Sequence, residues 1–596
     1  MRRRRWAGCA AAVVAAVLLG GCASLPDSST PQAIGTIAQE PANPVVPAPA
    51  PGREPNLLLR DFLAASTDPT DRHAAARKFL TTSAAATWDD SVETTIVDKV
   101  DVLPESQRSD DQAGYTIRAN RVGQLGQGGV YQAVEGTYEA TVRLVRENGE
   151  WRIDQLPPGV ILDRPQFLKT YQRKALYFLD PTGSTTVPDL RWISTNPQDL
   201  ADTLIRMLIA GPKPSLQGAV SNQLADVRLA DPITKADGRS AGVGIGFGGL
   251  RIQFEGTGPL DVVSRDRLAA QVVWTLANAE IPGPYVLIGD GKPLDERLPN
   301  GWTTADVSST NPAASGAAAV GLYALRDGAL VRVTDEGIDP EPGYFGSGSD
   351  LRSAALSRDG RSAAAVAAPA TRPGTESVSP PEAVSTLMVG PVDGQASRVA
   401  EGGTLTRPTW ALGDTAVWTV VDGARVLRTA PGPAGEWTVE QVDTADIASL
   451  GTTITEFRLS RDGTRAAAII DGKVYAVTVI PRPEGGYRLT GAQPIAVGLG
   501  SPAVTLDWST GDAIVVVRAA SDIPVVSVSV DGSRMDALPS RNLTPPVTAV
   551  EATPSMTYVA DALAVFQLNS TDPAGDRYWR EVPGLTGVRA VPVLAG

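Results

Sequence analysis

The chain has 596 residues, of which 42% are hydrophobic and 20% are charged, the ordinary balance of a globular protein. At about 100–200 residues per domain, this length predicts about three domains. The formal net charge is −13, and removal of residues 1–21, with four arginines and no acid, lowers it to −17, which argues against a general affinity for nucleic acid or anionic lipid headgroups.

Residues 1–21 have the pattern of a secretory signal. Four arginines at positions 2–5 precede an apolar run that is shorter than the about 20 residues needed to cross a bilayer. The run ends in Leu19-Gly20-Gly21-Cys22, which resembles the bacterial lipobox. This resemblance implies cleavage after Gly21 and a diacylglycerol on the sulfur of Cys22. The alternative is an ordinary signal peptide that ends in a cysteine by chance.

The chain has two cysteines, and neither leaves a free thiol in a lipidated protein. Cys9 is lost with the signal, and the lipid occupies Cys22. We therefore expect no disulfide, no thiolate metal ligand and no nucleophilic cysteine, so that hydrophobic cores hold the exported chain together.

Residues 22–55 are rich in proline, alanine and serine. This composition favours extended conformers of about 3.1 Å per residue. We expect a lipidated tether that lifts the folded domains off the membrane. The alternative is an arm packed on a domain, for which residues 33–37 are the best candidate.

Residues 56–165 are expected to form an α+β domain. Apolar residues at helical spacing predict a helix around Leu58 and Phe62, and a second helix from Asp68-Pro69 to Leu80. Alternating residues predict strands on both sides of Asn148-Gly149, a dipeptide typical of two-residue hairpin turns. Two helices followed by a meandering sheet resemble the nuclear-transport-factor-like cone fold, in which helices cover a curved sheet and leave a pocket.

Residues 170–300 are expected to form an α/β domain. Asn196-Pro197 offers the N-cap of a helix that Gly211-Pro212 ends, and Ser264 is expected to cap a second helix. A strand at 285–288 leads into the turn Gly289-Asp290-Gly291.

A leucine-rich helix that ends in Gly-Pro, here Leu208–Pro212, resembles the most specific part of the GerMN module. That module occurs in bacterial spore-germination and cell-envelope lipoproteins. It has no established catalytic residues, so the resemblance implies a binding or assembly role.

After a linker at 306–315, residues 316–596 show an internal repeat. Leu356-Ser357-Arg358-Asp359-Gly360 recurs as Leu459-Ser460-Arg461-Asp462-Gly463, and weaker relatives begin at Trp410 and Trp508. The spacing of about 50 residues is the period of four-stranded propeller blades. Asp-Gly suits the hairpin between the first two strands of a blade, because Asp bonds its own backbone and Gly takes positive φ. We expect a C-terminal β-propeller of five or six blades, closed by strands from both ends of the region. The whole chain is therefore multidomain and mainly β.

The sequence offers little catalytic chemistry. The one histidine, His73, lies among charged residues on what we interpret as the solvated face of the second helix. A serine–histidine–aspartate arrangement would have to use it. With no free cysteine and one histidine, we expect no zinc or copper site and no cofactor.

The remaining acidic motifs are interpreted as turns. Asp359, Asp462 and Asp531 each precede glycine but lack the ladder of carboxylates that binds calcium. The Ser357 turn resembles a sialidase Asp box only in part, because its glycine comes one place too early. Asp290-Gly291-Lys292 is interpreted as a hairpin rather than a phosphate-binding loop. We therefore expect no catalytic residues and no enzyme, although paired carboxylates between blades stay open.

Signal, lipobox, cone-like domain, GerMN module and propeller occur in the order that is found in the LpqB family of actinobacterial lipoproteins, which the whole chain resembles. The mature start Cys22-Ala23-Ser24-Leu25-Pro26 and the two Ser-Arg-Asp-Gly turns also support this resemblance. It implies a lipid-anchored protein on the outer face of the cell membrane. It also implies an accessory role in the MtrA–MtrB two-component system, through the extracellular domain of the sensor kinase MtrB, with an effect on cell-wall homeostasis and division.

Two other functions compete with this interpretation. The first is a binding lipoprotein for a cell-envelope lipid or peptidoglycan, which would use the pocket of the cone-like domain. The second is a hydrolase with paired carboxylates in the propeller channel.

Overall fold

The computed structural model describes residues 48–230, 232–238, 248–313, 320–348, 350–371, 383–433 and 435–596. The lipobox residues Leu19, Gly20 and Gly21, the lipidation residue Cys22 and the tether as far as residue 47 lie outside this described part. Within it, no helix is long and apolar enough to cross a membrane.

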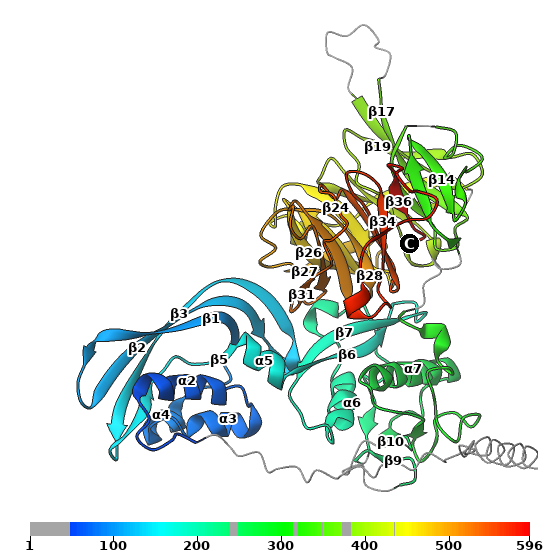
Figure 1. Ribbon diagram of the computed structural model, residues 1–596. Helices are drawn as coiled ribbons and strands as arrows, with labels where there is room; N and C mark the ends of the chain where they lie inside the picture. Colours follow the sequence, from blue (N-terminus) through cyan, green and yellow to red (C-terminus); the bar gives the residue numbers. More distant parts are fainter. Residues whose placement is uncertain are drawn as a thin grey trace, which may run out of the picture. The chain divides into compact units, whose positions relative to one another are not determined.

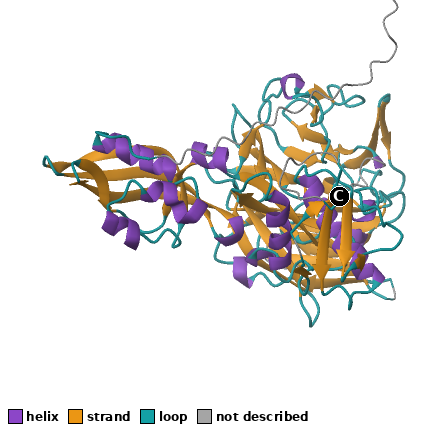
Figure 2. Cartoon of the chain, turned by 90° about the horizontal axis from the view of Figure 1, so that it is seen from below, coloured by secondary structure: helices purple, strands orange, loops and turns teal. Residues whose placement is uncertain are grey.

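The first domain packs helices on one face of a curved sheet (Figure 1). The helices are α2 (Pro55–Ala65), α3 (Thr70–Arg77), α4 (Thr82–Thr87) and α5 (Arg164–Thr170). The sheet has the order β4-β3-β2-β1-β5, with β1 (Thr94–Arg108), β2 (Gln112–Leu125), β3 (Tyr131–Glu147), β4 (Glu150–Gln155) and β5 (Val160–Asp163). Register shifts in β1 mark bulges, which bend a strand and increase its twist. The view from below shows the helices lying along the long strands (Figure 2).

Side chains fill the space between these helices and the sheet. Phe62 of α2 meets Trp88 edge to face, with ring centroids 5.8 Å apart. Both rings pack with Ile117 and Leu144, whose side chains are fully buried in the sheet. The predicted turn Asn148-Gly149 is present, with φ of 54° and 82°.

His73 corrects one sequence expectation. The sequence places it on a solvated helix face, but it is buried, with its ring centroid 6.0 Å from that of Trp88. The reason is local: φ is positive at Asp71, Arg72 and His73, so a left-handed turn rotates the imidazole inward. The regular helix also ends at Arg77, short of the predicted Leu80.

The second domain contains a β-hairpin, a mixed sheet and two helices. The hairpin pairs β6 (Gln172–Leu179) with β7 (Thr186–Ile193). The sheet has the order β12-β11-β10-β8, with β9 also on β10: β8 (Arg228–Leu229), β9 (Thr234–Lys235), β10 (Leu250–Glu255), β11 (Tyr285–Gly289) and β12 (Lys292–Pro293). The helices are α6 (Leu200–Ala210) and α7 (Val262–Asn278). Strands β10 and β11 are parallel, which requires a crossover connection, and α7 forms this crossover.

Both helices of this domain begin at other residues than predicted. Helix α6 begins after Asp199, because residues 196–199 form a separate turn closed by the Asp199 amide and the Asn196 carbonyl. The N-cap of α7 is Asp261, whose carboxylate accepts a hydrogen bond from the Ser264 amide at 2.8 Å. Ser264 is thus inside the helix.

The third domain contains six four-stranded sheets among the described residues, which we number as blades 1–6. Blade 1 consists of β36 (Val591–Val593), β13 (Tyr323–Arg326), β14 (Ala329–Thr334) and β15 (Gly337–Pro340). Blade 2 consists of β16 (Leu351–Leu356), β17 (Ser362–Thr371), β18 (Ala383–Pro391) and β19 (Ser397–Gly402). Blade 3 consists of β20 (Thr409–Trp410), β21 (Val417–Val421), β22 (Arg425–Pro431) and β23 (Trp437–Gln441). Blade 4 consists of β24 (Ile454–Leu459), β25 (Arg465–Ile470), β26 (Lys473–Pro481) and β27 (Tyr487–Pro494). Blade 5 consists of β28 (Ala503–Thr510), β29 (Ala513–Arg518), β30 (Val525–Ser529) and β31 (Met535–Ala537). Blade 6 consists of β32 (Ala549–Ala552), β33 (Met556–Ala560), β34 (Val565–Asn569) and β35 (Arg580–Glu581).

The first strand of each blade contacts that of the next, and β36 closes the ring between β32 and β16. The C-terminal strand therefore completes the first blade, as expected for a propeller closed by both ends of its sequence.

The Asp-Gly motifs form turns, as expected. Gly360 and Gly463 each have φ of 70°, and each follows an aspartate that accepts a hydrogen bond from the serine two residues earlier. Both turns join the first two strands of a blade. Asp531-Gly532 has the same geometry but joins the third and fourth strands of blade 5.

Strand β7 is buried along its whole length, and its contacts extend beyond its own domain. Leu190 packs in the core shared by blades 4 and 5. The Trp192 indole nitrogen donates to the Asp531 carboxylate at 3.2 Å, and Arg191 donates to the Gly128 carbonyl of the first domain at 2.9 Å. Arg465 of blade 4 donates to the Pro188 carbonyl. This one strand thus contacts both the first domain and the propeller.

Candidate functional site

The axis of the propeller holds a buried network of ion pairs. Arg407 contacts Glu456 at 2.7 Å and Glu551 at 2.5 Å, and Arg458 contacts Asp507 at 3.2 Å. These side chains come from four different blades or from the segments before them, so the network ties the inner strands to one another. The cavity beside it has a volume of only about 20 Å³, which is room for about one water molecule.

Burial and charge oppose each other in this network. Burial raises the pKa of Glu551 to about 7, against the effect of Arg407. Burial would also raise the pKa of Asp507, but the charges of Arg458, Arg407 and Arg461 outweigh it, so this pKa is lowered. Arg407 stays charged, because its carboxylate neighbours outweigh the burial that would lower its pKa.

The arginines of the two Ser-Arg-Asp-Gly turns lie at the same axis. Arg358 donates to the Arg461 carbonyl at 2.8 Å, and Arg461 donates to the Trp508 carbonyl at 3.0 Å. The repeated arginine of this motif therefore links blades. The carboxylates that a propeller hydrolase would need are close together here, and each is bound to an arginine.

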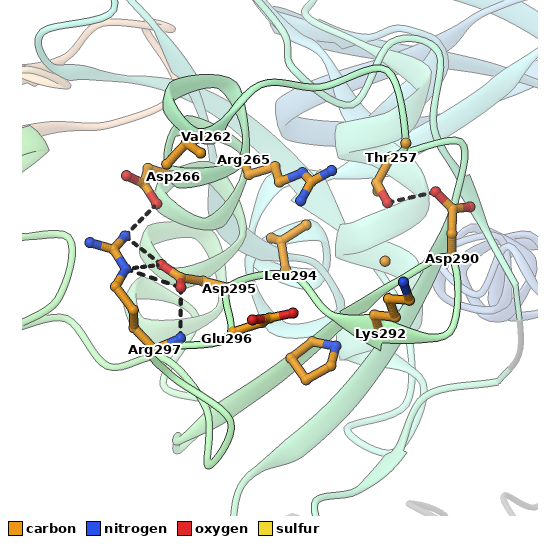
Figure 3. A pocket seen from close by; sticks show the side chains of 13 residues that line it. Thr257, Val262, Arg265, Asp266, Asp290, Lys292, Leu294, Asp295, Glu296 and Arg297 are labelled. Carbon is orange, nitrogen blue, oxygen red and sulfur yellow. Dashed lines mark hydrogen bonds and ion pairs between the residues drawn. The ribbon is translucent and has the colours of Figure 1, made fainter.

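A larger cavity, of about 600 Å³, lies in the second domain (Figure 3). It is bounded by the N-terminal half of α7, by the loop after β10 and by residues 289–297, which run from the end of β11 through β12. The cavity thus lies at the carboxyl ends of the two parallel strands β10 and β11. In open α/β sheets, ligands bind at this edge.

Most carboxylates around the cavity are bound to protein groups. Asp290 accepts hydrogen bonds from the Gly256 amide and the Thr257 hydroxyl, both at 2.8 Å, and these bonds lower its pKa. Asp295 accepts from the Arg297 guanidinium, which lowers the pKa of Asp295. Arg297 also lies 3.6 Å from Asp266, whose pKa burial raises.

Two cations of the cavity have no such partner. Arg265 of α7 is half-buried, and its Nε atom is buried without a hydrogen bond. Lys292 of β12 is exposed. Within the described ranges neither side chain has an ion pair or hydrogen bond, and both point toward the cavity (Figure 3). Among the described residues that line the cavity, Glu296 is the one carboxylate whose side chain has no ion pair or hydrogen bond.

Sequence reasoning placed one part of this cavity and missed the other. The expected hairpin Gly289-Asp290-Gly291 is present, with positive φ at Asp290 and Gly291, and Lys292 follows it. Arg265 was not singled out, because one arginine in a helix has no motif around it. Its spacing of three and seven residues from buried Leu268 and Val272 is the signal that it lies near the buried face. Among the described residues, no group of three or more histidine, cysteine, aspartate or glutamate side chains could hold a metal ion.

Comparison with known proteins covers all three domains. Residues 48–168 match the family model of the lipoprotein LpqB N-terminal domain, and residues 328–595 that of the lipoprotein LpqB beta-propeller domain. Residues 175–295 match the family model named Germane, which is described as "Sporulation and spore germination".

Curated relatives match over almost their whole length. Lipoprotein LpqB of Rhodococcus opacus (strain B4) is 60% identical, over 100% of this chain and 99% of the relative. Lipoprotein LpqB of Nocardia farcinica (strain IFM 10152) is 50% identical over 99% and 98%, and that of Mycolicibacterium smegmatis 44% identical over 97% and 98%. With such identity over almost the whole of both chains, and with two family models of lipoprotein LpqB matching it, the chain belongs to the lipoprotein LpqB family.

Proposed function

We propose that the protein is an accessory regulator of the MtrA–MtrB two-component system, which acts by binding the extracellular domain of the sensor kinase MtrB and thereby affects cell-wall homeostasis and division. In this proposal, a lipid on Cys22, after the lipobox Leu19-Gly20-Gly21, holds it on the outer face of the cell membrane. Binding, rather than catalysis, is its mode of action.

The observation that carries the binding role is the closed propeller axis. Its carboxylates are bound to arginines, which tie the inner strands of four blades together, and the adjoining cavity has a volume of about 20 Å³. The ring then serves as a rigid scaffold whose outer surface is available to a partner. Family membership supports the identity of that partner through the resemblance described above.

The anchor supports the same role physically. Attachment of both proteins to one membrane raises their effective concentration without any new contact. A regulator then needs only a difference in affinity for two states of the kinase, typically about 1–3 kcal/mol.

The core under α2, α3 and α4 of the first domain does not favour the alternative of an envelope ligand bound within it. Phe62, Trp88 and the sheet residues that face them fill the space under the helices. A ligand in that space would have to displace the core.

The test is crosslinking in cells from exposed carboxylates on the propeller, which has a single lysine, Lys473, read by mass spectrometry. The native protein should crosslink to the extracellular domain of MtrB and fractionate with membranes. Cys22→Ala should lose both properties. Cys9→Ala is the matched control, since Cys9 leaves with the signal, and should behave as the native protein.

Two results would overturn parts of the proposal separately. A native protein whose Cys22 lacks the mass of a diacylglycerol would refute the lipid anchor. A membrane-bound native protein that yields no MtrB crosslinks, while other envelope proteins are crosslinked, would refute the regulatory role.

A further inference from the structure

We infer that the cavity beside α7 in the second domain binds an anionic group, a carboxylate or a phosphate, between Arg265 and Lys292. This inference is independent of the proposed binding of MtrB, because it concerns another domain and another ligand. It starts from the imbalance of partners around the cavity.

The aspartates of the cavity are bound to protein groups, whereas the side chains of Arg265 and Lys292 are not. Asp290 is held by Gly256 and Thr257, and Asp295 is held by Arg297. None of these carboxylates pairs with Arg265 or Lys292 in the part of the chain that the structure describes. An incoming anion would therefore find two free cations and displace no existing ion pair.

Arg265 is the stronger of the two anchors. Its Nε is closed to solvent, but its two terminal nitrogens are not buried and have no hydrogen-bond partner among the described residues, so an anion in the cavity can accept hydrogen bonds from them. Guanidinium groups bind carboxylates and phosphates through two parallel hydrogen bonds, whereas the Lys292 ammonium acts as a point charge. Exposed Lys292 alone would be an ordinary surface lysine; facing the same cavity as Arg265, it completes the site.

The cavity is also in the place and of the size expected of a ligand site. It lies at the carboxyl ends of two parallel strands, and about 600 Å³ is within the usual range of ligand pockets. A neighbouring hollow of about 500 Å³ shares Asp266 and Arg297 with it, and another of about 480 Å³ shares Asp290. The anionic group can therefore belong to a molecule much larger than one ion.

Glu296 gives the inference a second, opposite prediction. Its carboxylate lines the cavity with no partner, so it repels an anion at Arg265. Neutralising Glu296 should strengthen anion binding, whereas neutralising either cation should weaken it.

The experiment is calorimetric titration of the full-length protein, in detergent at low salt, with sodium phosphate and with sodium succinate. Sodium chloride is the ionic control. At least one of the two probes should bind the native protein in the millimolar range or tighter. Arg265→Gln should weaken that binding by about tenfold or more, as expected for the loss of a hydrogen bond to a charged group. Lys292→Gln should weaken it less, and Glu296→Gln should strengthen it.

Arg251→Gln is the matched control, because it removes the same charge from β10 of the same domain, outside the cavity lining. It should leave binding unchanged. Tighter phosphate binding would assign a phosphate-bearing ligand, and tighter succinate binding a carboxylate. No binding of either probe beyond that of chloride would overturn the inference. So would equal losses in Arg251→Gln and Arg265→Gln, or weaker binding in Glu296→Gln.

Discussion

Glu551 is a carboxyl group whose charge the fold opposes. It lies on β32 at the propeller axis with 2% of its surface exposed. Burial raises its pKa from the ordinary value of 4.5 to about 7 even though Arg407 lies 2.5 Å away. Between these two pH values the folded state binds a proton that the unfolded chain does not. Stability must therefore fall as the pH rises through this window.

Glu551→Gln should remove this dependence. At pH 5 the native side chain is protonated and resembles glutamine, so the two proteins should be similarly stable. By pH 8 the native protein should have lost up to about 3 kcal/mol relative to the variant, at about 1.4 kcal/mol per pKa unit. Denaturant unfolding of both proteins at pH 5 and pH 8 measures this difference. Parallel pH profiles would show that Glu551 does not titrate in this range.

At the residue scale, local features were predictable and buried partners were not. The Asp-Gly turns and Asn148-Gly149 depend on the conformational preferences of adjacent residues, which the sequence contains. His73 was placed wrongly, because a left-handed turn of three non-glycine residues has no sequence signal. Arg407 and Glu551 are distant in sequence, so only the closure of the ring brings them together.

The element that closes the propeller is β36. It pairs with β13, and the Gly596 amide beyond it donates to the Leu356 carbonyl of blade 2 at 3.1 Å. Val593, Leu594 and Ala595 are buried in this segment. One short strand therefore supplies the inner edge of blade 1 and a contact with its neighbour.

Truncation after Arg589 should open the ring. The loss of two buried large side chains and of the strand pairing should destabilise the propeller by at least about 3 kcal/mol. Urea unfolding and limited proteolysis measure this effect. Deletion of Gly596 alone is the control, since it leaves every buried side chain in place and should cost much less. A truncated protein as stable and as protease-resistant as the native one would contradict the closing role of β36.

The sequence predicted that these helices and strands exist better than it predicted where they begin and end. The helices now labelled α6 and α7 were found by their apolar periodicity, which burial on the domain core confirms. Their first residues were misplaced because Asn196, Asp199, Asp261 and Ser264 are all good capping residues, and tertiary packing selects among them.

At the scale of the whole molecule, β7 makes contacts in two domains besides its own. Its Trp192 binds Asp531, which also accepts hydrogen bonds from Ser529 and Ser533 within its turn. The turn at Asp359 has the same local geometry but an exposed carboxylate and no indole partner. The two aspartates thus differ mainly in what surrounds the turn.

Asp531→Ala should therefore destabilise the protein far more than Asp359→Ala. The first leaves the Trp192 indole and the Ser533 hydroxyl without a buried acceptor, a loss of about 2–4 kcal/mol. The second removes a solvated turn bond, worth about 1 kcal/mol or less. Denaturant midpoints of the two full-length variants measure the comparison. Equal losses would mean that the contact with β7 adds nothing to stability.

Domain order was predictable because each domain carries its own periodicity and turn residues. The contacts of β7 with other domains were not predictable, because a fully buried strand has the same apolar sequence pattern whichever domain covers it. The pairing of Arg265 with Lys292 in the second-domain cavity was missed for a similar reason: the two residues lie on different elements, α7 and β12.

The position of β36 sets an order of events during synthesis. A ribosome makes β13 first and β36 only after every other strand of the six sheets. Until then the Tyr323–Arg326 edge has no partner, and a nascent chain carries five complete blades beside an incomplete one. Ring closure is thus a late step between segments far apart in sequence, which slows folding and prolongs exposure of an unpaired edge to aggregation or proteases.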